Sequence, residues 1–324
     1  MIFKRAVEFG IPVYPVLFGR AQMLFDIWKL GIWLKSRRIQ ILNTHSSRDG
    51  WLLGLAGRLA GVPLILRTRH IDVDYPSPRI SRVAYRTLAD HVLTTSDKIT
   101  AHLQRIFDLP NRQITTLPTG IDLKKFFPDG KRACLGDGPL VGMVSVLRSW
   151  KGHVDFLRAA ALLKGSGFRG RFVIVGGGQS PKWIEETIDE LGLGDVVTLF
   201  GHREDIPEVL RALDLLVIPS TRHEGIPQIG LQALATKTAV VGSDVGGIPE
   251  IIRDGETGRI FPAGDIDAFA NAIRSVFSES ERTDRMREQG RELVEKCHSV
   301  ENMLDKIENL YRGYLTEREG RFPL

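Results

Sequence analysis

The chain has 324 residues, 43% of them apolar and 26% charged, which is typical of a soluble globular protein and excludes a disordered or fibrous one. Only two cysteines occur, Cys134 and Cys297, without CxxC spacing, which argues against a disulfide framework or a cysteine-built metal site and fits a reducing cytosol. The net charge of +5 is uneven, because residues 1–130 hold 19 Lys and Arg against 10 Asp and Glu. That basic part fits phosphates, nucleic acid or anionic lipid, and an ordinary solvated surface explains it equally well.

Short apolar runs alternate with helical patterns from the start of the chain. The predicted strands are 11–16, 39–45, 62–68, 91–96 and 113–120, followed by 139–147, 171–178, 196–201, 215–220 and 239–244. Strands rich in Val, Ile and Leu, separated by helix-length segments, are typical of βα units with parallel sheets. From about residue 266 onward the pattern is purely helical. The sequence predicts neither a secretory signal nor a membrane span, since its best apolar stretch, 51–66, contains Arg58 and Pro63.

A cluster of Pro, Gly and charged residues at 124–139 separates the two series of strands. We therefore expect an α/β fold of two doubly wound, Rossmann-like domains. Ligands in such sheets bind beyond the carboxyl ends of the strands, so the cleft between the domains is the expected site.

The segment VLRSWKGH (146–153) follows the first strand of the second series. Arg148 offers a planar fork of donors and Lys151 a compact charge, a pair that suits a diphosphate, although surface arginines and lysines are common. The Gly-rich VGGGQ (175–179) also stands at a strand end, where backbone amides can approach a phosphate, but a tight turn explains it better.

The stretch STRHEGIPQIGLQALA (220–235) carries the strongest signal for a site. A helix is expected to begin near Pro227, and free amides at its start favour an anion. Glu224 beside such an anion site is placed to accept hydrogen bonds from the hydroxyls of a polyol. DVGGIPEII (244–252) repeats the device with Glu250. The ordinary explanation of each glutamate is an exposed charge at a helix start.

His70 ends the segment RTRH (67–70) and is expected in the same cleft, where it would orient a hydroxyl or shuttle a proton. A lone histidine is more often structural. The Asp-x-Asp pattern DVD (72–74) is one that can hold a divalent metal ion and a nucleotide diphosphate. Since DID (265–267) recurs in the same chain by chance, no metal site is predicted.

Six motifs agree in order and spacing with one enzyme family. They are LPTGID (117–122), VSVLRSWKGH (144–153), FVIVGGG (172–178), VVTLFGHREDIPEVLRALDLLVIPS (196–220), EGIPQIGLQALATKTAVVGSDVGGIPEII (224–252) and DGETGRIFPAGD (254–265). Over roughly residues 115–315 the chain closely resembles the retaining glycosyltransferases of family 4, which have the GT-B fold. The first half matches more loosely, through 44–70 and 89–97.

The resemblance implies an acceptor-side domain (1–125), a donor-binding domain (126–305) and a last helix (306–324) that crosses back to the first domain. Arg148 and Lys151 stand where the family binds the diphosphate, Glu224 matches the first glutamate of its E-x7-E motif, and His70 matches a histidine against the transferred sugar. The remaining donor contacts would come from these residues: Gly201, His202 and Arg203 near the nucleobase, and Gly225, Ile226, Pro227 and Gln228 near sugar hydroxyls or phosphate.

Two departures from the family are visible. Gln232 replaces the second glutamate, which accepts hydrogen bonds from ribose hydroxyls, and the loss of its charge is worth about fivefold in affinity. The chain also opens after the strand, Gly-rich loop, helix and second strand with which members begin, a unit of about 30 residues or more. The expectation is a sequence that starts late, in preference to a protein with impaired catalysis.

The implied reaction moves a sugar from a UDP-, GDP- or ADP-sugar to a hydroxyl of a glycan or lipid-linked acceptor, with retention and without metal or cofactor. No carboxylate nucleophile is evident, which favours same-face displacement. Lipopolysaccharide or a similar envelope glycan is the expected product, made in the cytoplasm at the inner face of the plasma membrane. The segment RAQMLFDIWKLGIWLKSRR (20–38) would touch anionic lipid, or would form a helix packed on the first sheet.

Two other functions stay open: a non-catalytic sugar-nucleotide-binding or scaffold protein, and a GT-B-like sugar-nucleotide epimerase. The pattern of Arg148, Lys151 and Glu224 favours transfer over epimerisation. Nucleic-acid binding is disfavoured, since no recognised module occurs.

Overall fold

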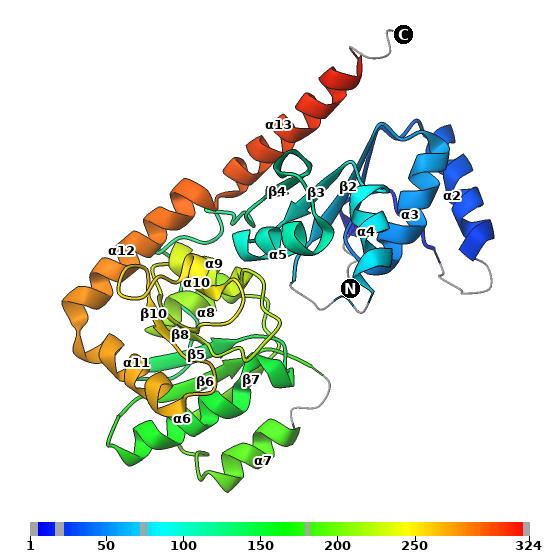
Figure 1. Ribbon diagram of the computed structural model, residues 1–324. Helices are drawn as coiled ribbons and strands as arrows, with labels where there is room; N and C mark the ends of the chain where they lie inside the picture. Colours follow the sequence, from blue (N-terminus) through cyan, green and yellow to red (C-terminus); the bar gives the residue numbers. More distant parts are fainter. Residues whose placement is uncertain (1–5, 17–22, 72–74, 76, 179–181, 320–324) are drawn as a thin grey trace.

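The computed structural model of the protein describes residues 6–16, 23–71, 75, 77–178 and 182–319. They form two parallel sheets, each covered by helices, which confirms the predicted fold of two doubly wound α/β domains (Figure 1). The metal-like pattern at 72–74 lies outside the described residues.

The first sheet has the spatial order β1-β2-β3-β4. Its strands are β1 (Ile41–Thr44), β2 (Leu64–Arg69), β3 (His91–Thr94) and β4 (Ile114–Thr116), and every neighbouring pair is parallel. The helices of this domain are α2 (Met23–Ser36), α3 (Ser47–Ala60), α4 (Pro78–Arg86) and α5 (Asp97–Phe107), with the short 3-10 helix η2 (Asn111–Gln113). The predicted strand at 11–16 is wrong, since this segment has no regular structure. Its two prolines, Pro12 and Pro15, have no N–H for a strand ladder.

The second sheet has the order β10-β9-β8-β5-β6-β7, so its strand order reverses between β5 and β8. Its strands are β5 (Leu140–Val144), β6 (Arg171–Val175), β7 (Val197–Gly201), β8 (Leu215–Ile218), β9 (Ala239–Ser243) and β10 (Arg259–Phe261). Its helices are η3 (Ser149–Lys151), α6 (His153–Gly165), α7 (Lys182–Glu190), α8 (Ile206–Ala212), α9 (Gln228–Ala235), α10 (Ile248–Ile251), α11 (Ile266–Ser278) and α12 (Ser280–Cys297). The three-residue β10 was not predicted. The switch point between β5 and β8 is where such sheets bind ligands.

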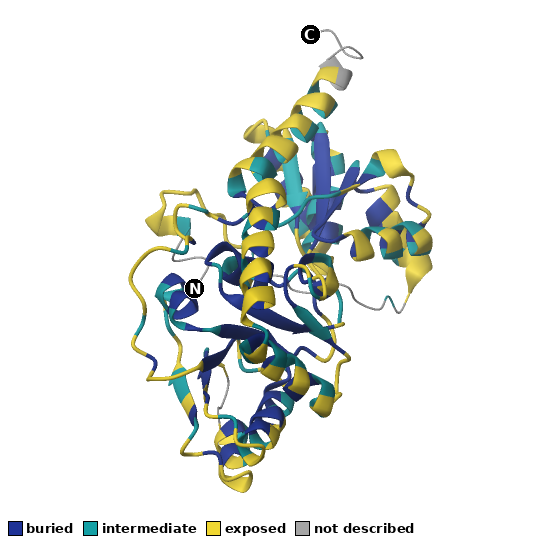
Figure 2. Cartoon of the chain, turned by 90° about the vertical axis from the view of Figure 1, so that its left-hand side faces the viewer, coloured by how far each residue is buried: buried dark blue, intermediate teal, exposed yellow. Residues whose placement is uncertain are grey.

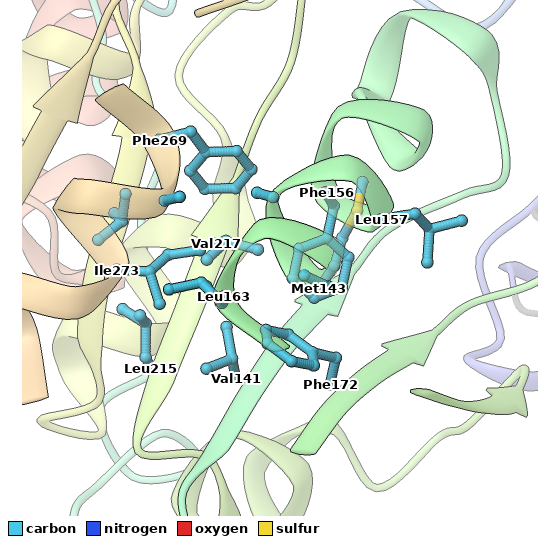
Figure 3. Close-up of a cluster of buried hydrophobic side chains, with 14 of the residues drawn as sticks. Val141, Met143, Phe156, Leu157, Leu163, Phe172, Leu215, Val217, Phe269 and Ile273 are labelled. Carbon is cyan, nitrogen blue, oxygen red and sulfur yellow. The ribbon is translucent and has the colours of Figure 1, made fainter. Parts of the chain in front are cut away.

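The core of the second domain follows from the alternation of side chains along its strands. In β5, Val141 and Met143 point to one face and pack with Phe156 of α6 and Phe269 of α11 (Figure 3). Leu140 and Val144 belong to the cluster on the opposite face. A strand that is buried on both faces is fixed in position, and so is the loop at its carboxyl end.

Helix α2 lies on α3 at the outer side of the first domain (Figure 1). Ile27, Leu30 and Leu34 are buried in that contact. On the opposite face Leu24 is 81% exposed and Trp28 60% exposed, so α2 keeps an apolar outer surface. Within the described residues no helix is long and apolar enough to cross a bilayer.

The chain passes between the two domains twice. Residues 117–139 lead from β4 to β5, and α13 (Val300–Glu319) returns from α12 to the first domain (Figure 1). The two crossings touch each other, because Ile121 N–H donates to His298 O (2.7 Å) and Val300 N–H donates to Ile121 O (3.0 Å). Near its far end α13 is tied to the first sheet by Tyr314, whose hydroxyl is 2.8 Å from Nδ1 of His91. Figure 2 shows the largely exposed outer face of α12 and α13.

Candidate active site

Lys151 and Glu224 form an ion pair at the carboxyl edge of the second sheet. Lys151 ends the 3-10 turn after β5, and Glu224 lies in the loop between β8 and α9. The Lys151 Nζ donates to both carboxylate oxygens of Glu224, at 2.9 and 2.8 Å, and Ser220 Oγ donates to the same carboxylate at 2.8 Å. The Glu224 side chain is 9% exposed and that of Lys151 20%. The structure therefore brings together a cation and an anion that the sequence assigns to phosphate and to sugar.

Glycines set the path of the two loops that hold this pair. Gly152 has a φ of +80°, and a Cβ there would lie 1.8 Å from Pro219 O, so the turn after Lys151 presses on the end of β8. Gly246 has a φ of +59°, and a Cβ there would lie 2.0 Å from Glu224 O. The segment 244–252 therefore packs directly against the backbone of Glu224 and fixes its position.

Arg148 lies over the ring of Trp150. Its side chain is exposed, and the guanidinium carbon lies 5.0 Å from the centre of the Trp150 ring. An exposed side chain changes rotamer at low cost, so Arg148 can adjust to a diphosphate that binds at Lys151.

Three cavities meet at Gln228, the first residue of α9. One of about 350 Å³ includes Lys151 and Glu224. A second, of about 480 Å³, includes His202, Arg203 and Gln232, and a third, of about 470 Å³, includes His70 of the first domain. Gln228 lines all three. A ligand with a base, a diphosphate and a sugar has the modular shape that such connected cavities accommodate.

The cavity of about 480 Å³ lies beyond β7. Gly201 ends that strand with a φ of +65° and leads to the exposed His202. Arg203 donates from Nε to Asp205 Oδ1 at 2.9 Å, so part of its guanidinium is already engaged. Gln232, partly exposed, is one turn after Gln228 on α9. Backbone groups near Gly201 and the Gln232 amide are the polar groups best placed for a ligand there.

The cavity of about 470 Å³ spans the two domains. His70 follows β2 and lies edge to edge with His45, which follows β1, with Nε2 of His70 and Nδ1 of His45 2.9 Å apart. The pKa of His70 is lowered by burial and then by the neighbouring His45 and Arg69. The rest of the cavity wall is neutral and consists of Asn43, Thr68, Leu93, Thr94, Thr95, Leu117, Thr119, Ile226, Gln228, Met303 and Ile307.

The two domains also touch each other directly at two points. Gly225 packs on the first domain, since a Cβ there would lie 2.3 Å from His70 O. Glu250 accepts hydrogen bonds from the backbone N–H groups of Asp97 (2.9 Å) and Lys98 (3.0 Å) at the start of α5. The sequence predicted Glu250 as an exposed charge on its own helix, whereas the structure shows it capping a helix of the other domain.

His45 is a residue that sequence analysis missed as a member of this site. His45 is the last residue of the predicted strand 39–45 and lies in the matching segment 44–70, which was the available signal. Among the described residues, no group of three or more His, Cys, Asp or Glu side chains is arranged to hold a metal ion. Metal independence stays a prediction.

Comparison with known proteins identifies the family. The model for glycosyl transferases of group 1 matches residues 130–293, and the model for glycosyltransferase family 4 matches residues 3–125. The UDP-Gal:alpha-D-GlcNAc-diphosphoundecaprenol alpha-1,3-galactosyltransferase of Escherichia coli is 29% identical over 308 residues, which cover 89% of this chain and 78% of that protein.

Two solved structures share the fold. A glycosyltransferase from Rickettsia africae ESF-5 aligns with a TM-score of 0.87 at 21% identity, covering 97% of this chain and 88% of that one. HepE from Anabaena, solved in complex with UDP, aligns with a TM-score of 0.82 at 18% identity, covering 96% and 89%. The two sheets and the cleft between them are therefore those of a GT-B glycosyltransferase. Since the group 1 model alone matches half of its residues, the chain belongs to the glycosyl transferases of group 1.

Proposed function

We propose that the protein transfers a sugar from UDP-sugar to a hydroxyl group of an acceptor, with retention of configuration and without a metal ion. The observation that carries this proposal is the convergence of three cavities on Gln228, beside the ion pair of Lys151 and Glu224. The choice of UDP over GDP or ADP is supported by two relatives, the Escherichia coli enzyme named for UDP-Gal and the Anabaena protein that binds UDP.

In this reaction the ion pair exchanges partners. The donor diphosphate takes Lys151 Nζ, and a sugar hydroxyl donates to the released Glu224 carboxylate, which Ser220 continues to orient. The bond between the anomeric carbon and the phosphate oxygen breaks as the acceptor oxygen bonds to that carbon on the same face. The acceptor proton passes to the departing phosphate. Lys151, Arg148 and the amides at the start of α9 stabilise the charge that builds on the diphosphate.

The surroundings of Glu224 favour same-face displacement over double displacement, which would also retain the configuration. When Lys151 turns to the diphosphate, Ser220 Oγ still donates to the Glu224 carboxylate, and the remaining acceptor positions are free for sugar hydroxyls. This carboxylate is better suited to hold sugar hydroxyls than to attack the sugar.

Thermal stability with nucleotides tests the donor site. A ligand at 100 times its dissociation constant stabilises the fold by about 2.7 kcal/mol. We expect UDP and one UDP-sugar to raise the Tm, and GDP and ADP to leave it unchanged. Lys151→Ala and Arg148→Ala should each reduce turnover strongly while the protein still folds. Absence of a shift with every nucleotide, or near-normal turnover in both variants, contradicts the proposal.

For the acceptor we propose a lipid-linked envelope glycan, such as a lipopolysaccharide precursor, at the cytoplasmic face of the plasma membrane. The Escherichia coli relative is named for a diphosphoundecaprenol acceptor. In this chain the outer face of α2 exposes Leu24, Phe25, Trp28 and Ile32, and the exposed Lys35, Arg37 and Arg38 follow at its end. An apolar face with a basic end matches an anionic bilayer surface.

Flotation with liposomes tests this surface. Vesicles with anionic phospholipid should bind the protein at low salt and release part of it at high salt, because the basic contribution is screened. Trp28→Ser should weaken binding, whereas Leu304→Ser, a substitution of an exposed leucine on α13, should not. Failure to bind anionic vesicles at low salt excludes a membrane-facing α2.

A further inference from the structure

His70 has a histidine partner that no sequence motif assigned. Nδ1 of His45 and Nε2 of His70 are 2.9 Å apart, which is a hydrogen-bond distance, and the two rings are 5.2 Å apart with their planes 9° from parallel. His45 is held in turn by its backbone, because its N–H donates to Asp49 Oδ2 at 2.9 Å in the capping box of α3. The position of His45 is thus set by β1 and α3, independently of any ligand.

The bond between the rings decides which nitrogen of His70 a ligand meets. Its Nε2 is occupied by His45, so Nδ1 is the ring nitrogen left for a ligand in the cavity. In a neutral imidazole one nitrogen donates and the other accepts, so the tautomer of His45 dictates the tautomer of His70. A change at His45 is therefore transmitted to the cavity as a change in what His70 can accept or donate.

The pair also has an electrostatic consequence. A hydrogen bond between the facing nitrogens needs one of them without a proton, so the bond cannot exist when both rings are cationic. Of the charged residues that the structure describes, Arg69 lowers the pKa of His70, and Asp49 binds the backbone N–H groups of His45 and Ser46. On the second domain the cavity is closed by Ile226 and Gln228, which carry no charge. The surroundings therefore favour a neutral His70 at neutral pH.

The side chains that line the cavity around the two histidines indicate which kind of ligand it binds. Asn43, Thr68 and Thr95 supply amide and hydroxyl groups, and Thr68 Oγ1 donates to Asn43 Oδ1 at 2.8 Å. Met303 and Ile307 of α13 supply an apolar side. A wall that combines hydroxyl and amide groups with apolar side chains fits an uncharged sugar ring, whose edges carry hydroxyls and whose faces carry C–H groups.

We propose that His45 is a positioning residue of this cavity, which binds a neutral sugar at the reacting end of the acceptor. His45 holds the His70 ring so that Nδ1 of His70 contacts the acceptor hydroxyl, and it keeps His70 uncharged. This inference rests on the proposed function, because it gives the cavity its place in sugar transfer.

The first arm of the test needs no substrate. Imidazole ¹⁵N resonances of His70 are followed between pH 4 and pH 8 in the wild type, His45→Gln and His45→Phe. Phe keeps an aromatic ring without nitrogens, and Gln keeps a hydrogen-bonding group without a titrating charge. We expect the pKa of His70 to rise in both variants, because the repulsion from His45 is removed. In His45→Phe we also expect the neutral His70 ring to populate both of its tautomers. An unchanged tautomer and pKa in His45→Phe would overturn the proposal.

The second arm measures UDP release from a UDP-sugar with water as the acceptor, and UDP affinity by calorimetry. His45→Phe should lower kcat on the order of 10-fold and move the acid limb of the pH profile to higher pH, with UDP affinity unchanged. His45→Gln should restore part of the loss. His102→Gln, in the same domain, is the matched control. If His45→Phe has the rate and the pH profile of the wild type, the role of His45 is refuted. If the wild type itself does not bind UDP, the proposed function is refuted, and the ¹⁵N titration of His70 alone then decides whether His45 positions His70.

Discussion

The carboxylate of Glu250, in the second domain, accepts a hydrogen bond from the backbone N–H of Asp97, 2.9 Å away in the first domain. Asp97 opens α5, and the first amides of a helix have no partner within it. Glu250 therefore supplies to α5 the negative charge that a helix start favours, and it does so across the cleft.

Glu250→Ala should loosen this contact between the domains. We expect faster hydrogen exchange at the amides of Asp97 and Lys98 and a larger radius of gyration by small-angle scattering. The free energy of unfolding should fall by about 1 kcal/mol. Glu256→Ala removes an exposed carboxylate that pairs with Arg253 in the same domain, and it should change none of these three quantities. Equal exchange at Asp97 in both variants would show that the Glu250 contact does not hold the domains.

Lys151→Met should destabilise the protein by about 2 kcal/mol in urea unfolding, because it leaves the nearly buried carboxylate of Glu224 without its cation. Ser220 still donates to that carboxylate, which limits the loss. The double variant Lys151→Met/Glu224→Gln should recover most of the stability, since neither partner then carries a buried charge. Additive losses in the double variant would mean that the pair is not coupled.

The stability of the fold should fall steeply in mild acid. Burial lowers the pKa of His91, His153 and His298 from 6.5 to about 4 in each case. Between these values the unfolded chain binds protons that the folded chain excludes, so stability is present above about pH 6.5 and is lost as the pH falls toward 4. Each histidine contributes up to about 1.4 kcal/mol per pH unit.

His298→Gln tests this mechanism. Nδ1 of His298 is buried without a hydrogen-bond partner in the described structure. Its replacement should make the free energy of unfolding, measured in urea at pH 7, 6 and 5, less dependent on pH by about one proton. A slope equal to that of the wild type would assign the acid sensitivity to other groups.

Gly225→Ala should impair catalysis with little effect on folding. A methyl group at Gly225 would lie 2.3 Å from His70 O, so the two domains must separate at that point. We expect turnover to fall by at least 10-fold because the reacting groups lose their alignment. Gly313→Ala on α13, where nothing lies within 4 Å of an added Cβ, should keep activity and stabilise the helix by up to about 1 kcal/mol. Wild-type turnover in Gly225→Ala would contradict the close approach.

The sequence predicted the strands well because the buried parallel strands are short Val, Ile and Leu runs bounded by loops. It failed at 11–16, where prolines interrupt an apolar run, and at β10, which is only three residues long. Among the site residues, Glu224 and Lys151 were found separately from their types and positions. Their ion pair was not, because it depends on how two loops 73 positions apart pack at the switch point. The partner of Glu250 was beyond prediction for the same reason, since it belongs to another domain.

The hydrogen bonds of Ile121 with His298 and Val300 tie the two interdomain crossings together at one point. Two connections that were widely separated would act like the two hinges of a door and permit rotation about the line between them only. Two connections joined at a point act as a pivot, so the domains can both swing and twist while the distance at Ile121 stays constant. Glu250 and Gly225 contact the first domain across the cleft. A cross-link between Glu250 and the start of α5 would therefore block both motions, whereas one placed at Ile121 would leave the pivot free.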